Sequence, residues 1–324
     1  MEFNQDKTHI IVYRSDELKI INMDPFRLLH FINTLPKIKL ARMFYKSNLI
    51  FFAGKDPINI ENSFNNENLY PSNVLNIYDD VKKEVIESIK LNTEIEEVQV
   101  TKNFVSILSG IHIYVYKLED LKKYVYKFDV TNKNYCLSNN SIIYVGQNKN
   151  QPENEIIKIL TFGDNKTIEI KAHENKIKCM AINKEATHLA TASERGTIIR
   201  IFNIQNGDKL FEFRRGTNSS IIQNIVFSND LNFLAVLSDR GTIHIYNLKN
   251  ITANRKSLLS VLGGYFDSDW SFAWYYDDIS NQIKKCCFNK DNELLIMTDN
   301  CLCQKISFNK EIGGICNLVD KYQQ

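Results

Sequence analysis

Residues 189–203 read LATASERGTIIRIFN, and residues 234–247 read LAVLSDRGTIHIYN. In each stretch, a β-type run leads into a Ser-acid-Arg-Gly-Thr turn, and a second β-type run follows, which is the pattern of a β-hairpin. The equivalent residues Ser193 and Ser238 are 45 positions apart. A weaker third copy covers residues 294–300. The chain therefore contains a repeated β unit.

The rest of the chain also has the period-two alternation of strands. Segment 82–90 can form a helix or a strand, and we favour a strand because residues 85–91 alternate and strands flank it. Asn-rich residues 56–73 are expected to form a surface loop, and charged residues 147–154 a hairpin turn. The expected β segments are 8–22 (a hairpin), 41–53, 74–80, 97–100, 104–108, 111–116, 124–128, 135–137, 141–145 and 155–161.

The repeat length predicts the architecture. A unit of about 45 residues with four short strands is a propeller blade. The 324 residues hold about seven such units, so we predict an all-β, WD-repeat-like, seven-bladed β-propeller that forms one domain over 1–324. Ser238 and Thr298 are 60 residues apart, and the surplus falls between Leu248 and Trp270.

Composition limits the possible functions. The formal net charge is +2 and the pI is about 8.0, which gives no overall electrostatic case for nucleic acid. The seven cysteines form no paired CxxC motif, and those on strands are expected to be small buried side chains in a reducing compartment. No signal peptide or membrane span is expected. We expect a cytoplasmic monomer without metal or cofactor.

Phe-Arg-Arg-Gly at 213–216 lies between the two hairpins. Adjacent side chains on extended backbone point in opposite directions, so Arg214 and Arg215 can serve two separate pockets. Gly216 is expected to let the backbone turn sharply. Both arginine side chains are expected to be surface-exposed. An ordinary solvated basic turn is the alternative interpretation.

The unit from Ala172 to Asn203 resembles a WD repeat, in which residues such as His173 and Ser193 tie a loop to a strand. The whole 172–274 block, with Phe-Arg-Arg-Gly between its hairpins and Asp-Trp-Ser-Phe-Ala at 269–273, resembles the PROPPINs, the phosphoinositide-binding propellers of autophagy. Residues 3–6 and 21–26 are similar to the family's first blade. The sequence departs from the family in its 56–73 insertion and its degenerate last blade.

The resemblance implies recognition of phosphatidylinositol 3-phosphate, and often the 3,5-bisphosphate, at two sites. Forked guanidinium groups with hydroxyl and imidazole donors suit phosphate chemically. The first predicted site contains Arg214, His173, Thr191, Ser193, Arg195 and Arg200, and the second contains Arg215, Ser219, Ser238, Thr242 and His244.

The surplus loop at about 249–269 is basic at its start and apolar afterwards. It resembles the membrane-inserting loop of the family's sixth blade, and this composition suits an interfacial wedge. A buried packing segment is the alternative. The predicted inserting residues are Leu258, Leu259, Val261, Leu262 and Phe266.

Enzymatic motifs are missing from the sequence: it has no Gly-x-Ser-x-Gly, no His-Glu-x-x-His and no phosphate-cradling glycine loop. We therefore expect a non-enzymatic protein, peripherally associated with phosphoinositide-bearing membranes. The resemblance implies autophagy proteins as partners, with a large lipid-transfer protein as a candidate. The main alternative is a WD-type scaffold that binds only proteins, and a hydrolase propeller is a distant third.

Overall fold

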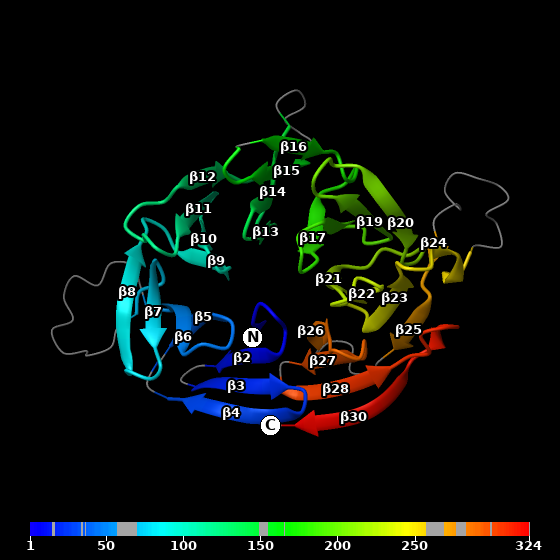
Figure 1. Cartoon of the computed structure of the whole chain (residues 1–324), viewed down its shortest axis with the longest axis horizontal. Coiled ribbons are helices and arrows are strands. Elements are labelled where there is room, and N and C mark those ends of the chain that lie inside the picture. The colour runs from blue at the N-terminus through cyan, green and yellow to red at the C-terminus, as the bar shows by residue number, and fades with distance from the viewer. Residues whose placement is uncertain are drawn as a thin grey trace. The chain divides into compact units, whose positions relative to one another are not determined.

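The structure is a computed structural model that describes residues 1–324 apart from 15–16, 34, 36, 57–69, 149–154, 165, 257–268, 277–282, 299 and 324. The described residues form seven β-sheets and no α-helix, with one 3₁₀ turn at Ile251–Ala253. In each sheet four main strands pair antiparallel (Figure 1). The predicted seven-bladed β-propeller is therefore confirmed.

Two compact units divide the blades. The first unit consists of residues 1–133 and 137–139 and contains three blades. Their strands are β1 (Glu2–Phe3), β2 (His9–Arg14), β3 (Glu17–Met23) and β4 (Phe26–Ile32) in the first blade; β5 (Ile38–Met43), β6 (Leu49–Gly54), β7 (Val74–Asp79) and β8 (Glu84–Lys90) in the second; and β9 (Ile95–Val100), β10 (Phe104–Ser109), β11 (His112–Lys117) and β12 (Tyr126–Asp129) in the third.

The second unit, residues 134–136 and 140–324, carries the other four blades. Their strands are β13 (Tyr135–Leu137), β14 (Ser141–Gln147), β15 (Glu155–Thr161) and β16 (Thr167–Ile170) in the fourth; β17 (Ile177–Ile182), β18 (His188–Ser193), β19 (Ile198–Asn203) and β20 (Lys209–Arg214) in the fifth; β21 (Ile222–Phe227), β22 (Phe233–Ser238), β23 (Thr242–Asn247) and β25 (Ala273–Tyr276) in the sixth; and β26 (Ile283–Phe288), β27 (Leu294–Thr298), β28 (Leu302–Ser307) and β30 (Asn317–Gln323) in the seventh.

Two short extra strands extend the fifth and sixth blades. Strand β24 (Asp269–Trp270) pairs parallel with β20, and β29 (Gly314–Ile315) pairs parallel with β25. Each is two residues long, so neither has a pattern that sequence analysis can detect. Each lies at the outer edge of its sheet, one strand beyond the repeated hairpin.

The strand predictions agree with the structure. Segment 84–90 is a strand, β8, and both repeated hairpins form, as β18–β19 and β22–β23. Their register places alternate side chains on opposite faces of the blade. The seven cysteines are free, and all but Cys179 are buried. The tips of the predicted 56–73 and 147–154 loops lie outside the described residues.

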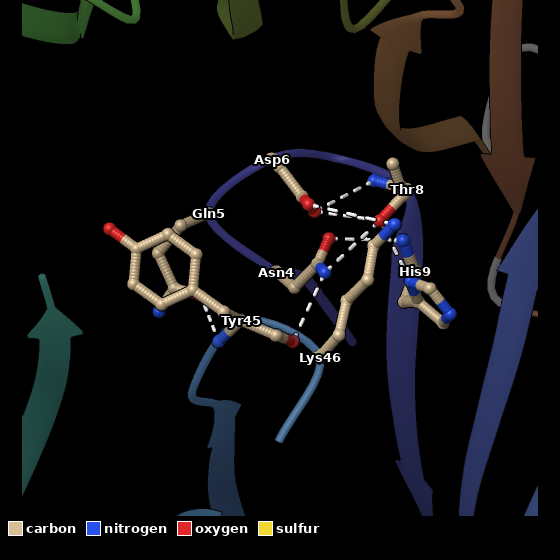
Figure 2. Close-up of polar contacts among 7 residues, drawn as sticks. All are labelled: Asn4, Gln5, Asp6, Thr8, His9, Tyr45 and Lys46. Carbon is tan, nitrogen blue, oxygen red and sulfur yellow. Dashed lines mark hydrogen bonds and ion pairs between the residues drawn. The ribbon is translucent and has the colours of Figure 1, made fainter. Parts of the chain in front are cut away.

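The N-terminal turn that resembles the family's first blade has a structural role. The buried Asn4 side chain donates to the carbonyl of Tyr45 (3.1 Å). Gln5 donates to the carbonyls of Met43 (2.8 Å) and Val100 (3.0 Å) and accepts from the Tyr45 amide (2.6 Å). Figure 2 shows the turn facing the 44–46 segment. These bonds tie the first blade to the second and third within the first unit.

Hydrophobic clusters join neighbouring blades in the second unit. One cluster combines Ala192 and Phe213 of the fifth blade with Val236 and Tyr246 of the sixth. Another joins the other face of the fifth blade, through Leu189 and other apolar residues, to the fourth. Both faces of the fifth blade are therefore packed, one against the fourth blade and one against the sixth. Each side chain of the fifth blade faces one of these two neighbours.

Gly196, not Gly216, is the glycine that the backbone requires near the arginines. Its φ is +58°, and a Cβ there would lie 1.9 Å from the carbonyl oxygen of Ser220. Gly216 is not among the residues with positive φ, and a Cβ added to it meets nothing within 4 Å. The backbone at Gly216 therefore does not require glycine, although the chain bends just after it, at residues 217–218.

Replacing Gly196 should consequently destabilise the fold. Gly196→Ala is expected to lower the free energy of unfolding by about 2 kcal/mol or more, because the left-handed backbone and the carbonyl contact both oppose a side chain. The matched change Gly216→Ala should have little effect. Urea denaturation of both variants tests this, and equal losses would contradict it.

Candidate functional site

Phe213 and the arginines after it end strand β20. Phe213 is buried in the cluster shared with the sixth blade, so its neighbours on β20 face the other way. Glu212 and Arg214 are two residues apart and share the face toward the fourth blade. Arg215 follows the end of the strand and contacts the turn before the sixth blade. The two arginines therefore lie on different flanks of one blade.

The first cluster consists of His173, Thr191, Arg200 and Glu212. Strand register sets Thr191 opposite Arg200, and Arg200 opposite Glu212, on the face that also carries Arg214. Nε2 of His173 is hydrogen-bonded to Oγ1 of Thr191 at 2.9 Å. This is the loop-to-strand tie of a WD repeat, made here with Thr191 rather than Ser193.

Arg200 already has partners in this cluster. Its Nε donates to Glu212 at 2.8 Å, and its Nη1 donates to the carbonyl of Ala172 at 2.6 Å. Lys209 also pairs with the Glu212 carboxylate at 3.1 Å. Arg200 is thus positioned to hold the cluster together, and a ligand phosphate would have to compete with Glu212 for it.

The second cluster consists of Arg215, Ser238, Thr242 and His244, with Ser271 added by the structure. Nε of Arg215 donates to the carbonyl of Gly196 at 2.9 Å, and Nη2 donates to the carbonyl of Asn218. The fully buried Ser238 hydroxyl donates to the carbonyl of Thr242 at 3.3 Å. Nδ1 of His244 lies 3.1 Å from Oγ of Ser271.

Burial keeps both imidazoles neutral at pH 7. The pKa of His173 is lowered to about 4 by burial and then by the charge of Arg200. The pKa of His244 is lowered to about 4 by burial and then by the charge of Arg215. Burial also lowers the pKa of Arg215 itself. The influence of Arg215 on His244 places them in one electrostatic environment.

Both arginines are buried: Arg214 is 1% exposed and Arg215 is 8% exposed. The expectation that they lie on the surface is wrong, because β24 pairs alongside Arg214 and backbone carbonyls surround the Arg215 guanidinium. The other predicted residues divide by exposure. Arg195 and Ser219 are exposed; Arg200, Thr242 and His244 are partly exposed; and His173, Thr191, Ser193 and Ser238 are buried.

Comparison with known proteins identifies the family. The sequence matches PROPPIN over residues 2–292. The chain belongs to the PROPPIN family. It is 26% identical over 306 residues to SVP1-like protein 2 of Kluyveromyces lactis, covering 92% of this chain and 85% of that protein. It is 25% identical over 356 residues to Autophagy-related protein 18 of Dictyostelium discoideum, covering 99% and 92%.

Solved structures share the fold. Kluyveromyces lactis Hsv2 superposes with a TM-score of 0.82 at 24% identity, covering 99% of this chain and 97% of the other. KlAtg21, solved in complex with the coiled coil of AgAtg16, gives 0.75 at 23% identity with the same coverage. PROPPINs are autophagy-related propellers of the phosphoinositide-binding class, and they act as binding modules and scaffolds.

Sequence reasoning missed four residues of this PROPPIN that border the clusters. Glu212 holds Arg200, and Ser271 contacts His244. Arg240 lies close enough to Arg215 to lower its pKa. Trp274 stands opposite His244 in the sheet. Glu212 could have been predicted, because it is two residues before Arg214 and alternation puts both on one face of the strand. Ser271 and Trp274 could not, because they follow the surplus loop and their position depends on how the chain returns to the sheet.

The predicted membrane-inserting residues all fall within 257–268, outside the described residues. The start of the loop is described and is anchored to the sixth blade. Asn254 donates to the carbonyl of Asn247 at 2.9 Å and accepts from its amide at 2.8 Å. The Arg255 guanidinium lies 3.8 Å from the centre of the Trp274 ring. Among the described residues, no helix is long and apolar enough to cross a membrane.

The two histidines make stability depend on pH. Each binds a proton in the unfolded chain below about pH 6.5 but in the folded chain only below about pH 4. The unfolded state therefore binds more protons within this window, and the free energy of unfolding should fall as the pH drops through it. The loss is on the order of 3 kcal/mol per histidine at most.

Urea denaturation between pH 7 and pH 4 measures this effect. His173→Gln and His244→Gln should each make the slope of stability against pH shallower, because each removes one titrating imidazole. An unchanged slope in both variants would show that these imidazoles are not the groups responsible.

Proposed function

We propose that this PROPPIN binds phosphatidylinositol 3-phosphate, and also the 3,5-bisphosphate, through two sites flanking residues 213–216. The observation that carries the proposal is the position of the arginine pair. Two consecutive cations lie on opposite flanks of one blade, and each is beside a cluster with imidazole and hydroxyl groups. Charge-assisted hydrogen bonds from guanidinium to phosphate are short and strong.

Burial of the arginines suits this chemistry. Arg215 is held by the carbonyls of Gly196 and Asn218 before any ligand arrives, so binding costs little side-chain entropy. A guanidinium in a low-dielectric environment also attracts a phosphate more strongly than one in bulk water does. Ser219 is exposed four residues after the pair, and the exposed Arg195 is next to this turn, because its carbonyl accepts from the Ser220 amide at 3.1 Å. Both side chains are available for the outer oxygens of a headgroup.

We further propose that the protein acts as a peripheral membrane scaffold that recruits autophagy proteins. Family membership and the KlAtg21 complex support a protein partner. A scaffold that binds only proteins remains the competing function, in which the arginine pair meets acidic peptides. Lipid binding separates the two functions.

Removing both guanidinium groups should abolish membrane binding. Arg214→Thr with Arg215→Thr is expected to eliminate flotation with phosphatidylinositol 3-phosphate liposomes, and each single change should only weaken it, because one site survives. The double variant should also lose thermal stability, since it empties two buried positions.

Leu189→Ala provides the matched control. It opens a buried position elsewhere in the fifth blade but keeps Phe213 and both cations, so stability should fall while flotation persists. Flotation of the double variant at the level of the unchanged protein would exclude the two-site proposal.

We propose that the loop at about 249–269 inserts between lipid headgroups through Leu258, Leu259, Val261, Leu262 and Phe266. Leu258→Asp with Leu262→Asp should sharply reduce liposome binding without changing affinity for the soluble headgroup, because charge opposes burial in the interface. Val81→Asp with Ile111→Asp, at exposed apolar positions of the first unit, is the control. A large fall in melting temperature specific to the 258 and 262 changes would mean that the segment is packed inside the protein.

A further inference from the structure

The sixth blade continues outward from the second cluster in a defined row. His244 on β23 pairs with Trp274 on β25, and Trp274 pairs with Ile315 on β29. Two pairs further along, Thr242 stands opposite Tyr276. Paired residues in adjacent strands project from the same face of a sheet. Trp274, Tyr276 and Ile315, here called the outer ridge, therefore share the face that carries His244.

The neighbouring residues support this orientation. Ala273 and Cys316, which flank the row, are buried in the core shared with the seventh blade. Because side chains alternate, Trp274 and Ile315 must project from the opposite face. That face packs on the fifth blade through Val236 and Tyr246. The row therefore runs outward from a packed core, past the second cluster, to the edge of the sheet.

The outer ridge exposes large apolar and aromatic side chains. Ile315 is 70% exposed and Tyr276 is 62% exposed, and Trp274 is partly exposed. Arg255 lies over the Trp274 ring and adds a cation at the same level. Scattered exposed apolar residues need no explanation, but a contiguous row next to a charged cluster marks a contact surface.

We propose that the outer ridge is a second lipid-contacting element, lying at the boundary between headgroups and acyl chains. This proposal rests on the function proposed above and adds described residues on a separate segment of the chain to the membrane contact. Along the row, the side chains change from charged to aromatic to aliphatic, which is the order from the phosphates of a bilayer to its hydrocarbon. Arg215 and His244 suit the phosphate, Trp274 and Tyr276 suit the interface, and Ile315 suits hydrocarbon.

The spacing of the ridge matches the depth of a lipid interface. Strands in a sheet are about 4.8 Å apart, so Ile315, two strands beyond His244, lies roughly 10 Å from it. Interfacial protein segments bury their apolar faces about 5–10 Å into the headgroup boundary. A phosphate held at the second cluster would therefore bring Ile315 to that depth.

The chain's two tryptophans, Trp270 and Trp274, allow a direct test. Trp270→Phe leaves Trp274 as the only tryptophan. With phosphatidylinositol 3-phosphate vesicles whose acyl chains are brominated near the headgroup, its fluorescence should shift to the blue and be quenched. Vesicles without bromine should give the shift alone.

A binding experiment that keeps both tryptophans complements the fluorescence. Tyr276→Glu with Ile315→Glu should weaken vesicle binding about tenfold or more while leaving affinity for the soluble headgroup unchanged. Val81→Glu with Ile111→Glu, equally exposed but in the first unit, should leave both unchanged.

The outcomes distinguish the two proposals. Vesicle binding without quenching of Trp274, and without an effect of the Tyr276 and Ile315 changes, would overturn the outer ridge and leave the arginine sites standing. The same result would favour a protein as the occupant of this surface. Failure of the unchanged protein to bind either vesicles or soluble headgroup would overturn both proposals. If the ridge variant loses vesicle binding and headgroup affinity together, the ridge supports the second cluster structurally and does not contact lipid.

Discussion

The stack of Phe213 on Tyr246 fixes the geometry on which the rest of the site depends. The ring centres are 4.6 Å apart and nearly parallel, at 21°, and both rings are buried between the fifth and sixth blades. The Tyr246 hydroxyl donates to the carbonyl of Arg214 at 3.1 Å, and burial raises the pKa of this phenol well above its ordinary value. With Phe213 held on one face, alternation places Arg214 on the other, and Arg215 leaves the strand beside the sixth blade.

This constraint explains how one short motif serves two clusters. A blade between two neighbours has two packed faces, and a strand end is the place where consecutive side chains can reach both flanks. The first flank contains a satisfied ion pair, Arg200 with Glu212, that orients its neighbours. The second contains a guanidinium fixed by two carbonyls. The clusters are therefore not chemically equivalent, although the hairpins that carry them are near-copies.

The sequence was sufficient for everything that depends on side-chain period. The 45-residue spacing predicted the blades, and alternation in residues 85–91 correctly favoured a strand over a helix. The sequence was not sufficient to predict burial or backbone requirements that depend on contacts with backbone groups distant along the chain. The burial of Arg214 depends partly on a two-residue strand that returns from across the surplus loop. The left-handed backbone of Gly196 belongs to the repeated Ser-acid-Arg-Gly-Thr turn, but the close approach of a carbonyl 24 residues away, at Ser220, is encoded by no local pattern.

Burying a cation on each flank of one blade is unfavourable unless fixed dipoles replace the lost water. In this protein the Gly196 and Asn218 carbonyls provide those dipoles for Arg215. These bonds use only part of the guanidinium, so the proposed headgroup would accept charge-assisted hydrogen bonds from its remaining N–H groups. Folding has already removed most of the water around Arg215, so little further desolvation cost remains for the binding step. The burial that made the arginine pair unexpected is thus consistent with a phosphate site, because it lowers the cost of the binding step.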